Sequence, residues 1–316
     1  MTSAASTLPS IAVVIATRDR PILLRRALAS VLACRYDGDL EVVLVFDQSE
    51  PDPDVADDRV RVLTNRRRPG LAGARNSGIL AADADLIAFC DDDDTWLGSK
   101  LELQVPALMA EPGAELATTG IFVNVTKKTQ PGEPPDRGRS TPRVLDTERI
   151  TFADLLRSRL MEAHPSTFLL RRAALVGDLG LVDEDLPGSY AEDYDLLLRA
   201  ARRHDVIAVP APLTVVNWHP ASFFFERWRT MDDALEHLLD KHPEFAQEPA
   251  GLARILGQQA LAKAGSGDRV GARRKARLAL REDWRQPRGY LGLAASTGLV
   301  GPDAILRVAQ LRGKGF

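Results

Sequence analysis

The sequence predicts an α/β protein with a mostly parallel open sheet flanked by helices, followed by a C-terminal α-helical appendage. Over the first 95 residues, short β-branched apolar runs alternate with segments whose apolar residues recur every three or four positions, which is the pattern of βαβ units. The short runs are apolar along most of their length, as in strands whose two faces are both covered by helices. After residue 222 only helical patterns remain.

Length and composition set the outer limits of this prediction. The chain has 316 residues, of which 45% are apolar and 27% charged, so it is neither collagen-like nor wholly disordered. A net charge of -3 gives no general reason to expect a nucleic-acid partner. Two cysteines cannot form a disulfide framework or a thiolate zinc site, which favours a reducing, cytoplasmic setting. No run approaches the roughly 18 apolar residues of a membrane span, and the first ten residues do not resemble a signal peptide.

The first half of the chain contains four expected strands, at residues 11–16, 41–46, 60–63 and 85–90. One helix is expected between the first two strands and another over residues 74–82, followed by a helix over 99–110 and a strand over 115–125. Open sheets of this kind bind ligands beyond the carboxyl ends of their strands. The residues directly after each strand are therefore the first candidates for a functional site.

The second half begins with residues 127–143, KKTQPGEPPDRGRSTPR, which have four prolines and no apolar periodicity. This composition indicates a loop or a lid ordered by a ligand. Beyond it we expect helices over 152–157 and 192–203, and strands over 166–170, 206–209 and 213–218. Four further helical patterns cover residues 222–242, 250–264, 268–282 and 302–312. We therefore expect a sheet domain over residues 1–222 and a helical region over 223–316.

The strongest chemical signal is the acidic run CDDDDTW, Cys90 to Trp96, directly after an expected strand. Four adjacent carboxylates repel one another, and a bound cation is one way to neutralise them. Oxygen ligands of this kind suit Mg²⁺ or Mn²⁺. The alternative is a solvated acidic turn that caps the next helix through Asp94 or Thr95. The motif alone leaves both interpretations open.

A second acidic pair, Glu192 and Asp193, falls in the first turn of an expected amphipathic helix. The helix dipole stabilises carboxylates at that position whatever the function, so this pair alone is explained by helix capping. The pair becomes informative beside the acidic run, because a transfer reaction needs both a metal-bound leaving group and a separate carboxylate base.

Five motifs in order make the chain resemble a family 2 glycosyltransferase with the GT-A fold. The resemblance runs from Pro9 to Ser222 and implies that residues 1–222 form the nucleotide-sugar-binding and catalytic domain, with 223–316 as a helical C-terminal region. The motifs are PSIAVVIATRDRPILLRRALASVLA, EVVLVFDQS, GLAGARNSGILAADADLIAFCDDDDTW, FLLRRAALVGDLGLVDE and EDYDLLLRAARRHDVIAVPAPLTVVNWHPAS.

On the donor side, the resemblance implies that Asp47 accepts a hydrogen bond from the nucleotide base. A carboxylate is an acceptor only, so it suits the N3–H of uracil or thymine, which favours UDP or dTDP. Phe46 stands where family members often have a second acid. The other residues that the resemblance places beside the nucleotide are Ala16, Thr17, Arg18, Gly73, Arg75 and Asn76.

The resemblance also implies a DXD motif within the acidic run. Asp91 then faces the ribose or a metal-bound water, Asp92 lies beside the donor, and Asp93 is the direct metal ligand. His219 matches a histidine near the metal or the diphosphate, and the cofactor is Mn²⁺ or Mg²⁺. Asp193 matches the general base.

The predicted activity is that of an inverting, metal-dependent, hexosyltransferase-like enzyme that moves a sugar from a nucleoside-diphosphate donor to an acceptor hydroxyl. The acceptor is a glycan, a lipid-linked sugar or a small molecule, and a membrane surface is compatible with the sequence but not required. One alternative is a nucleotide-sugar-binding scaffold without turnover. A less favoured alternative, a sugar-1-phosphate nucleotidyltransferase, needs a glycine-rich basic loop after the first strand, where ATRDRP has no glycine.

Three further features have competing explanations. Trp96 either stacks on a sugar ring or packs the next helix. His164 either faces the donor sugar or is an ordinary polar residue at the start of a strand. Residues 263–288 contain nine basic and three acidic side chains. That stretch is either a solvated helix face, which we favour, or a surface for an anionic lipid or a lipid-diphosphate acceptor.

Overall fold

The computed structural model describes residues 8–125, 140–218, 227–298, 300–302 and 304–305. Backbone contacts divide the chain into two compact units. The sheet unit comprises Met1–Ile150, Glu162–Val182 and Arg199–Asn217, and the helical unit comprises Thr151–Met161, Asp183–Leu198 and Trp218–Phe316. The domain boundary expected between residues 222 and 223 falls in 219–226, outside the described residues, and stays a prediction.

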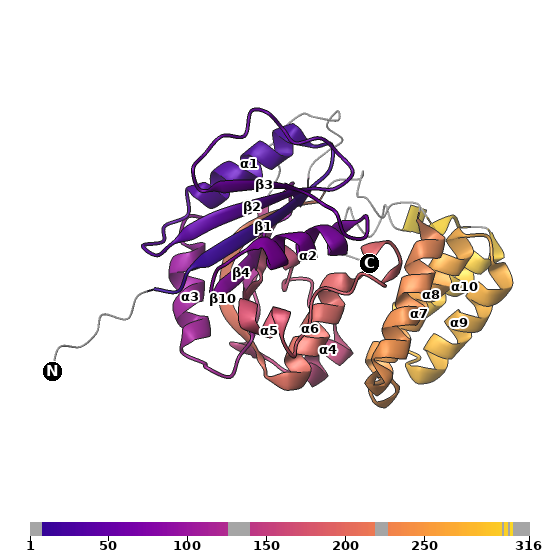
Figure 1. Cartoon of the computed structure of the whole chain (residues 1–316). Coiled ribbons are helices and arrows are strands. Elements are labelled where there is room, and N and C mark those ends of the chain that lie inside the picture. Colours follow the sequence, from indigo (N-terminus) through magenta and orange to yellow (C-terminus); the bar gives the residue numbers. More distant parts are fainter. Residues whose placement is uncertain (1–7, 126–139, 219–226, 299, 303, 306–316) are drawn as a thin grey trace. The chain divides into compact units, whose positions relative to one another are not determined.

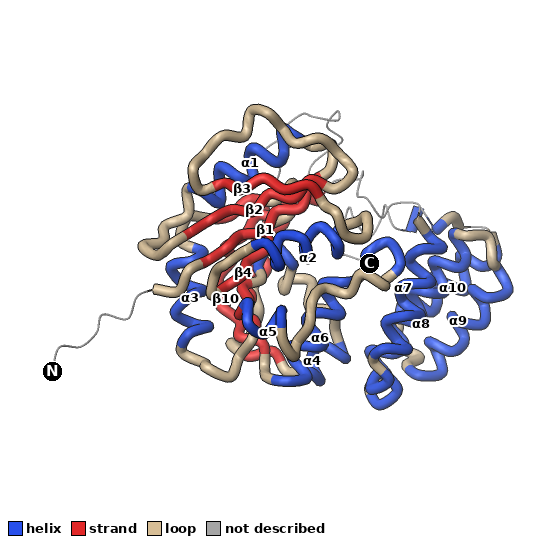
Figure 2. The backbone as a smooth tube through the Cα atoms, viewed as in Figure 1, coloured by secondary structure: helices blue, strands red, loops and turns tan. Residues whose placement is uncertain are grey.

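The sheet unit is built on one twisted sheet (Figures 1 and 2). Its strands follow the order β3-β2-β1-β4-β9-β6-β10-β5, with β7 paired to β6 and β8 to β10. The strands are β1 (Ile11–Thr17), β2 (Leu40–Phe46), β3 (Val60–Thr64), β4 (Leu86–Phe89), β5 (Thr95–Trp96), β6 (Leu116–Val125), β7 (Ser140–Arg143), β8 (Arg149–Ile150), β9 (Leu169–Arg171) and β10 (Val206–Trp218).

The direction of the strands changes across the sheet. Strands β3, β2, β1 and β4 are parallel, with Val14 of β1 opposite both Val43 of β2 and Phe89 of β4. From β4 onward the pairing is antiparallel: β9 pairs antiparallel with both β4 and β6, and β10 does so with β5 and β8. The open sheet expected from the sequence is therefore present, parallel from β3 to β4 and mixed through the antiparallel pairs beyond β4. The apolar pattern of a strand reports its burial and not its direction.

Alternating side chains of the central strands pack on opposite layers of helices. Ile11, Val13 and Ile15 belong to a core cluster with residues of α1 (Pro21–Leu32) and α3 (Lys100–Met109). On the other face, α2 (Leu71–Ala81) comes so close to β1 that a Cβ at Gly78 would overlap the side chain of Val14. This unit also contains the short helix α5 and a 3₁₀ turn, η1; their bounds are Arg172–Val176 and Pro165–Thr167.

The helical unit contains α4, α7, α8, α9 and α10, and helix α6 begins in it. Small residues allow close packing here: a Cβ at Gly292 would lie 2.6 Å from that of Ala260, and Trp228 covers Gly265. The bounds are α4 (Phe152–Arg157), α6 (Glu192–Arg203), α7 (Trp228–Lys241), α8 (Pro249–Gly265), α9 (Arg269–Glu282) and α10 (Pro287–Thr297), with 3₁₀ turns η2 (Pro187–Ser189) and η3 (Pro243–Gln247).

Most of the expected elements are present. The two strands expected over 206–209 and 213–218 are one strand, β10, and the structure adds α5, α10, β5 and β8, which were not expected. The helix expected over 302–312 lies mostly outside the described residues. The loop expected over 127–143 lies outside the described residues except for 140–143, which form β7 on β6; Pro142 fits there because β7 lies off the main path of the sheet. Within the described residues, the model contains no helix with the length and apolar character needed to cross a membrane.

Candidate functional site

The acidic run forms the connection between β4 and β5, at the carboxyl end of β4. Because β1 lies parallel beside β4, the residues that follow β1 reach this loop. Thr17 Oγ1 donates a 2.8 Å hydrogen bond to Asp92. Arg20 Nη1 lies 3.2 Å from a carboxylate oxygen of Asp92 and 3.1 Å from one of Asp93. The structure therefore brings together Thr17 and Asp92, both expected at the site, and adds Arg20, which the sequence analysis missed.

The carboxylate of Asp92 is held in a low-dielectric position. Its burial, reinforced by the negative charge of Asp93, raises the pKa of Asp92 to about 7, although Arg20 and the Thr17 hydroxyl both oppose that shift. Carrying a full negative charge at Asp92 is therefore costly in this structure.

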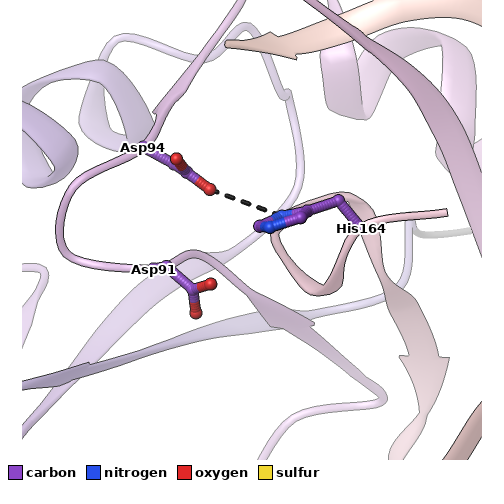
Figure 3. A group of neighbouring side chains, drawn as sticks. All are labelled: Asp91, Asp94 and His164. Carbon is purple, nitrogen blue, oxygen red and sulfur yellow. Dashed lines mark ion pairs between the residues drawn. The ribbon is translucent and has the colours of Figure 1, made fainter. Parts of the chain in front are cut away.

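Asp94 is the most deeply buried of the four aspartates in the run, with 1% of its surface exposed. One carboxylate oxygen accepts a 2.6 Å hydrogen bond from Ser166 Oγ, and the other accepts one of 3.1 Å from the backbone N–H of Asn217 in β10. Burial, with added repulsion from Asp93 and Asp91, raises the pKa of Asp94 well above its ordinary value. His164 Nδ1 lies 3.4 Å from the same carboxylate (Figure 3).

Asp91, Asp94 and His164 together form the candidate metal centre. Each offers one ligand atom, and these three atoms all lie within 4.8 Å of one another (Figure 3). Two carboxylates and an imidazole are a donor set that suits Mn²⁺ and accommodates Mg²⁺. Burial disfavours the ionised form of Asp94, and a bound cation would favour it, so the residues present fit such a group.

This grouping differs from the ligands expected from the sequence. Asp93, the expected direct ligand, pairs with Arg20 through one oxygen and is not in the group of three. His219, the other expected ligand, lies outside the described residues. His164 precedes η1, and no local pattern could connect it with Asp94, some 70 residues earlier.

Arg75 and Asn76 are both buried in α2 but make different contacts. Arg75 Nη2 forms a 2.6 Å ion pair with Asp91, and its guanidinium lies 5.1 Å from the centre of the Phe89 ring. The amide of Asn76 donates to the backbone oxygen of Val182 at 2.8 Å and accepts from its N–H at 2.9 Å. Arg75 therefore lies at the acidic loop, whereas Asn76 braces the segment at Val182.

Asp47, directly after β2, is buried and organises the connection from β3 to α2. It accepts hydrogen bonds from Asn65 Nδ2 at 2.8 Å, Gly70 N at 3.0 Å and Gln48 Nε2 at 3.0 Å. A carboxylate has about four acceptor positions, so one position is left for a ligand donor.

The remaining nucleotide-side candidates occupy the same edge of the sheet. Ala16, at the end of β1, is partly buried, and Arg18 is exposed beside Asp19. Gly73 has a steric requirement, because a Cβ there would overlap the backbone oxygen of Arg68. Trp96 packs in the core and donates to the backbone oxygen of Ser166 at 2.8 Å, which favours packing over sugar stacking.

Asp193, the expected base, lies in the helical unit, in the first turn of α6. One carboxylate oxygen accepts a 2.8 Å hydrogen bond from the N–H of Tyr194, and the other forms an ion pair with Arg159. The side chain is 16% exposed, and the neighbouring Glu192 is buried. The acid expected from the sequence is therefore accessible and held in one orientation.

The same turn of α6 is tied to the end of α7. Asp195 is fully buried, and its Oδ1 lies 2.9 Å from both His242 Nε2 and Lys241 Nζ. Lys241 also reaches Asp183 at 2.5 Å. A histidine in a helical, polar segment is typical of the surface, but His242 is fully buried, because Asp195 is the partner it needs there.

Backbone strain coincides with these candidates. In the described chain, the non-glycine residues with positive φ are Asp19, Gln48, Leu160, Ser189 and Ala191. Asp19 follows Arg18, Gln48 follows Asp47, and Leu160 follows Arg159, the partner of Asp193. Ser189 and Ala191 lie just ahead of Asp193. Such conformations cost about 1–3 kcal/mol each and concentrate at functional sites.

The comparison with protein families fits this geometry. The model of the family described as Glycosyl transferase family 2 matches residues 12–176, just over half of the chain. The chain belongs to glycosyl transferase family 2. The matched region contains the acidic loop, Asp47 and the buried Arg75, as well as His164.

Solved structures show that this family 2 chain has the GT-A fold. The crystal structure of S. aureus TarS 1-349 in complex with UDP-GlcNAc covers 97% of this chain and 93% of its own, with a TM-score of 0.59 and 16% identity. The mannosyltransferase PcManGT from Pyrobaculum calidifontis, in complex with GDP-Man and Mn²⁺, covers 97% and 85%, with a TM-score of 0.53 and 18% identity. At these identities the likeness concerns the fold alone.

A curated relative matches a shorter region. The UDP-Glc:alpha-D-GlcNAc-diphosphoundecaprenol beta-1,3-glucosyltransferase WfgD of Escherichia coli is 34% identical over 88 residues, which are 26% of this chain. The chain spans about a third of the length of that relative, 34%.

Proposed function

We propose that this protein is an inverting glycosyltransferase that depends on Mn²⁺ or Mg²⁺ and takes its sugar from a UDP- or dTDP-linked donor. The observation that carries the proposal is the grouping of Asp91, Asp94 and His164 at the carboxyl end of β4. That edge of the sheet is where an open α/β sheet binds its ligand.

The donor preference rests on Asp47. Its remaining acceptor position suits the N3–H of uracil or thymine, whereas cytosine presents an acceptor at N3 and would be repelled. The TarS structure holds UDP-GlcNAc, and the name of WfgD specifies UDP-Glc, which supports a uridine nucleotide. PcManGT holds GDP-Man, so a guanine nucleotide is the comparison to test.

The cation would be held by Asp91, Asp94 and His164, with Asp93 as the ligand expected from the sequence. When bound, the cation would neutralise negative charge on the departing nucleoside diphosphate. Arg75 keeps the Asp91 carboxylate in one orientation through the 2.6 Å ion pair. Arg20 partly neutralises Asp92 and Asp93, and so reduces their mutual repulsion.

Asp193 would act as the general base. Its carboxylate accepts the proton of the acceptor hydroxyl while that oxygen forms a bond to the anomeric carbon, and the bond from that carbon to the diphosphate oxygen breaks. A single in-line displacement inverts the anomeric centre. The acceptor would be a glycan, a lipid-linked sugar or a small molecule, and the diphosphoundecaprenol in the name of WfgD supports a lipid-linked one.

The proposal is tested by thermal shift with UDP, dTDP, GDP and CDP, each with MnCl₂ and with excess chelator. We expect UDP and dTDP to raise the melting temperature more with Mn²⁺ than with chelator. CDP is the matched control, because it differs from UDP only at the base edge that Asp47 would contact. Equal shifts with Mn²⁺ and with chelator would contradict metal dependence, and a larger shift with GDP or CDP would contradict the role of Asp47.

A further inference from the structure

Three arginines of the helical unit converge on two tyrosines near the predicted base. The guanidinium carbons of Arg159 and Arg254 lie 5.2 and 5.4 Å from the centre of the Tyr194 ring. Arg254 Nη2 also donates a 2.7 Å hydrogen bond to the Tyr194 hydroxyl. Arg288, at the start of α10, lies close enough to Arg254 and Tyr190 to interact electrostatically with both. These residues come from four separate segments, so the convergence is a product of the fold.

Arg254 has hydrogen-bonding capacity that the structure leaves unused. It is 9% exposed, and among the described residues its buried Nε atom has no hydrogen-bond partner. A buried donor without a partner is destabilising, because it has lost its hydrogen bonds to water. Burial and the positive charge of Arg254 together lower the pKa of Arg288, so the two guanidinium groups destabilise each other.

The carboxylate of the same turn that is seen to pair with this cluster does so through Arg159: Asp193 forms an ion pair with it. Arg254 contacts Tyr194, which is uncharged, and among the described residues no carboxylate forms an ion pair with Arg254. A bound anion would offset the repulsion between Arg254 and Arg288 and supply an acceptor for the unused Nε.

We propose that Arg159, Arg254 and Arg288 form a binding subsite for a phosphate or diphosphate group carried by the acceptor. Guanidinium groups match phosphate oxygens in a forked geometry and stay charged when partly buried. The assignment to the acceptor rests on the proposed function, because Arg159 contacts the residue that would deprotonate the acceptor hydroxyl. A fixed anion here would hold the acceptor and so position its hydroxyl for attack.

The test uses inorganic pyrophosphate as the probe, with excess chelator so that the acidic loop cannot bind it through a cation. Calorimetric titration compares the wild type with Arg254→Gln, Arg288→Gln and a control, Arg285→Gln. Arg285 is exposed against Trp284, so its replacement removes the same charge from the same unit outside the cluster. We expect the first two variants to weaken pyrophosphate binding at least tenfold and the control to bind as the wild type does.

Circular dichroism checks that each variant is folded, and Arg288→Gln keeps the test valid if Arg254→Gln unfolds. No binding of pyrophosphate by the wild type, or binding by both cluster variants as tight as that of the wild type, would overturn the subsite. Displacement of pyrophosphate by UDP in chelator would also overturn it, because the site would then belong to the donor diphosphate. Binding of UDP with Mn²⁺, measured on the same samples, separates the two proposals: its absence in the wild type refutes the proposed function and leaves the pyrophosphate result standing.

Discussion

The acidic loop of the sheet unit and the arginine cluster of the helical unit bury opposite charges. In the loop, four carboxylates, Asp91 to Asp94, lie close to Arg20 and Arg75, and burial with mutual repulsion raises the pKa values of Asp92 and Asp94. In the cluster, burial and the positive charge of Arg254 lower the pKa of Arg288. In each region the charged forms are therefore disfavoured, and a ligand of the opposite sign would stabilise them. The loop suits a cation and the cluster suits an anion.

The two regions also differ in how they are held. Residues in or next to three different strands fix the acidic loop: Thr17 ends β1, Ser166 precedes β9 and Asn217 lies in β10. The arginine cluster is instead assembled from helix starts and turns, with strained residues at Leu160 and Ala191. A sheet edge provides a rigid platform for a small ion, whereas helix ends and turns can accommodate a larger ligand.

The largest expected effect tests whether Asp193 takes part in catalysis or only stabilises the start of α6. Asp193→Asn keeps the size of the side chain but cannot take up the acceptor proton, so turnover should fall by about 10² to 10⁴ with donor binding almost unchanged. Until the acceptor is identified, turnover is measured as the slow hydrolysis of the donor to free sugar and nucleoside diphosphate. UDP binding is measured on the same variant.

The matched control for that prediction is Glu192→Gln on the same turn. If Asp193 only stabilises the first turn of α6, Asp193→Asn should cost about 0.3–1 kcal/mol of stability and leave turnover intact. A loss of turnover in Glu192→Gln and not in Asp193→Asn would instead place the base one residue earlier.

The next effect distinguishes the two candidate ligand sets in the acidic loop. We expect Asp91→Asn and Asp94→Asn to reduce the Mn²⁺-dependent gain in UDP affinity at least tenfold, and Asp93→Asn to reduce it less, because Asp93 is paired with Arg20 outside the group of three. Titrations of UDP with and without Mn²⁺ on the three variants measure this gain. The opposite order would restore Asp93 as the direct ligand.

The sequence predicted the acidic loop and the helix that carries Asp193 because both depend on local pattern. The acidic run follows a short apolar strand, and the amphipathic pattern after Glu192 predicts α6 with the bounds that the structure has. The family resemblance placed Asp47, Arg75 and Asp193, and the structure puts the first two at the carboxyl edge of the sheet.

The sequence could not predict contacts between distant segments. His164 meets Asp94 only because β9 lies between β4 and β6, and that antiparallel insertion has no local signature. The arginine cluster is hidden in the same way, since Arg159, Arg254 and Arg288 are separated by more than thirty residues and become neighbours only through packing. Arg20 was missed because its partners follow a different strand.

The smallest expected effect tests the premise shared by both regions, that a buried charge without a counter-charge lowers stability. Lys100 is fully buried and belongs to neither region. Its Nζ donates a hydrogen bond to Gln104 at 2.7 Å and lies 4.0 Å from the centre of the Trp96 ring. Burial lowers the pKa of Lys100 from 10.5 to about 7. At pH values between these two pKa values, the unfolded chain binds a proton at Lys100 that the folded chain does not. The free energy of unfolding therefore rises with pH over this range, and the cost of burying the charged amine is complete below pH 7.

Lys100→Met removes that penalty and also the hydrogen bond to Gln104. We therefore expect the variant to gain about 1–3 kcal/mol over the wild type at pH 6 and to lose most of this advantage by pH 9, measured by urea unfolding at both pH values. Lys263→Met is the matched control, because Lys263 is paired with Asp232 at 2.6 Å and its removal should stabilise the protein at neither pH. If the difference between Lys100→Met and the wild type is the same at pH 6 and pH 9, the buried charge at Lys100 carries no pH-dependent cost. The charge argument would then have to be abandoned for the acidic loop and the arginine cluster as well.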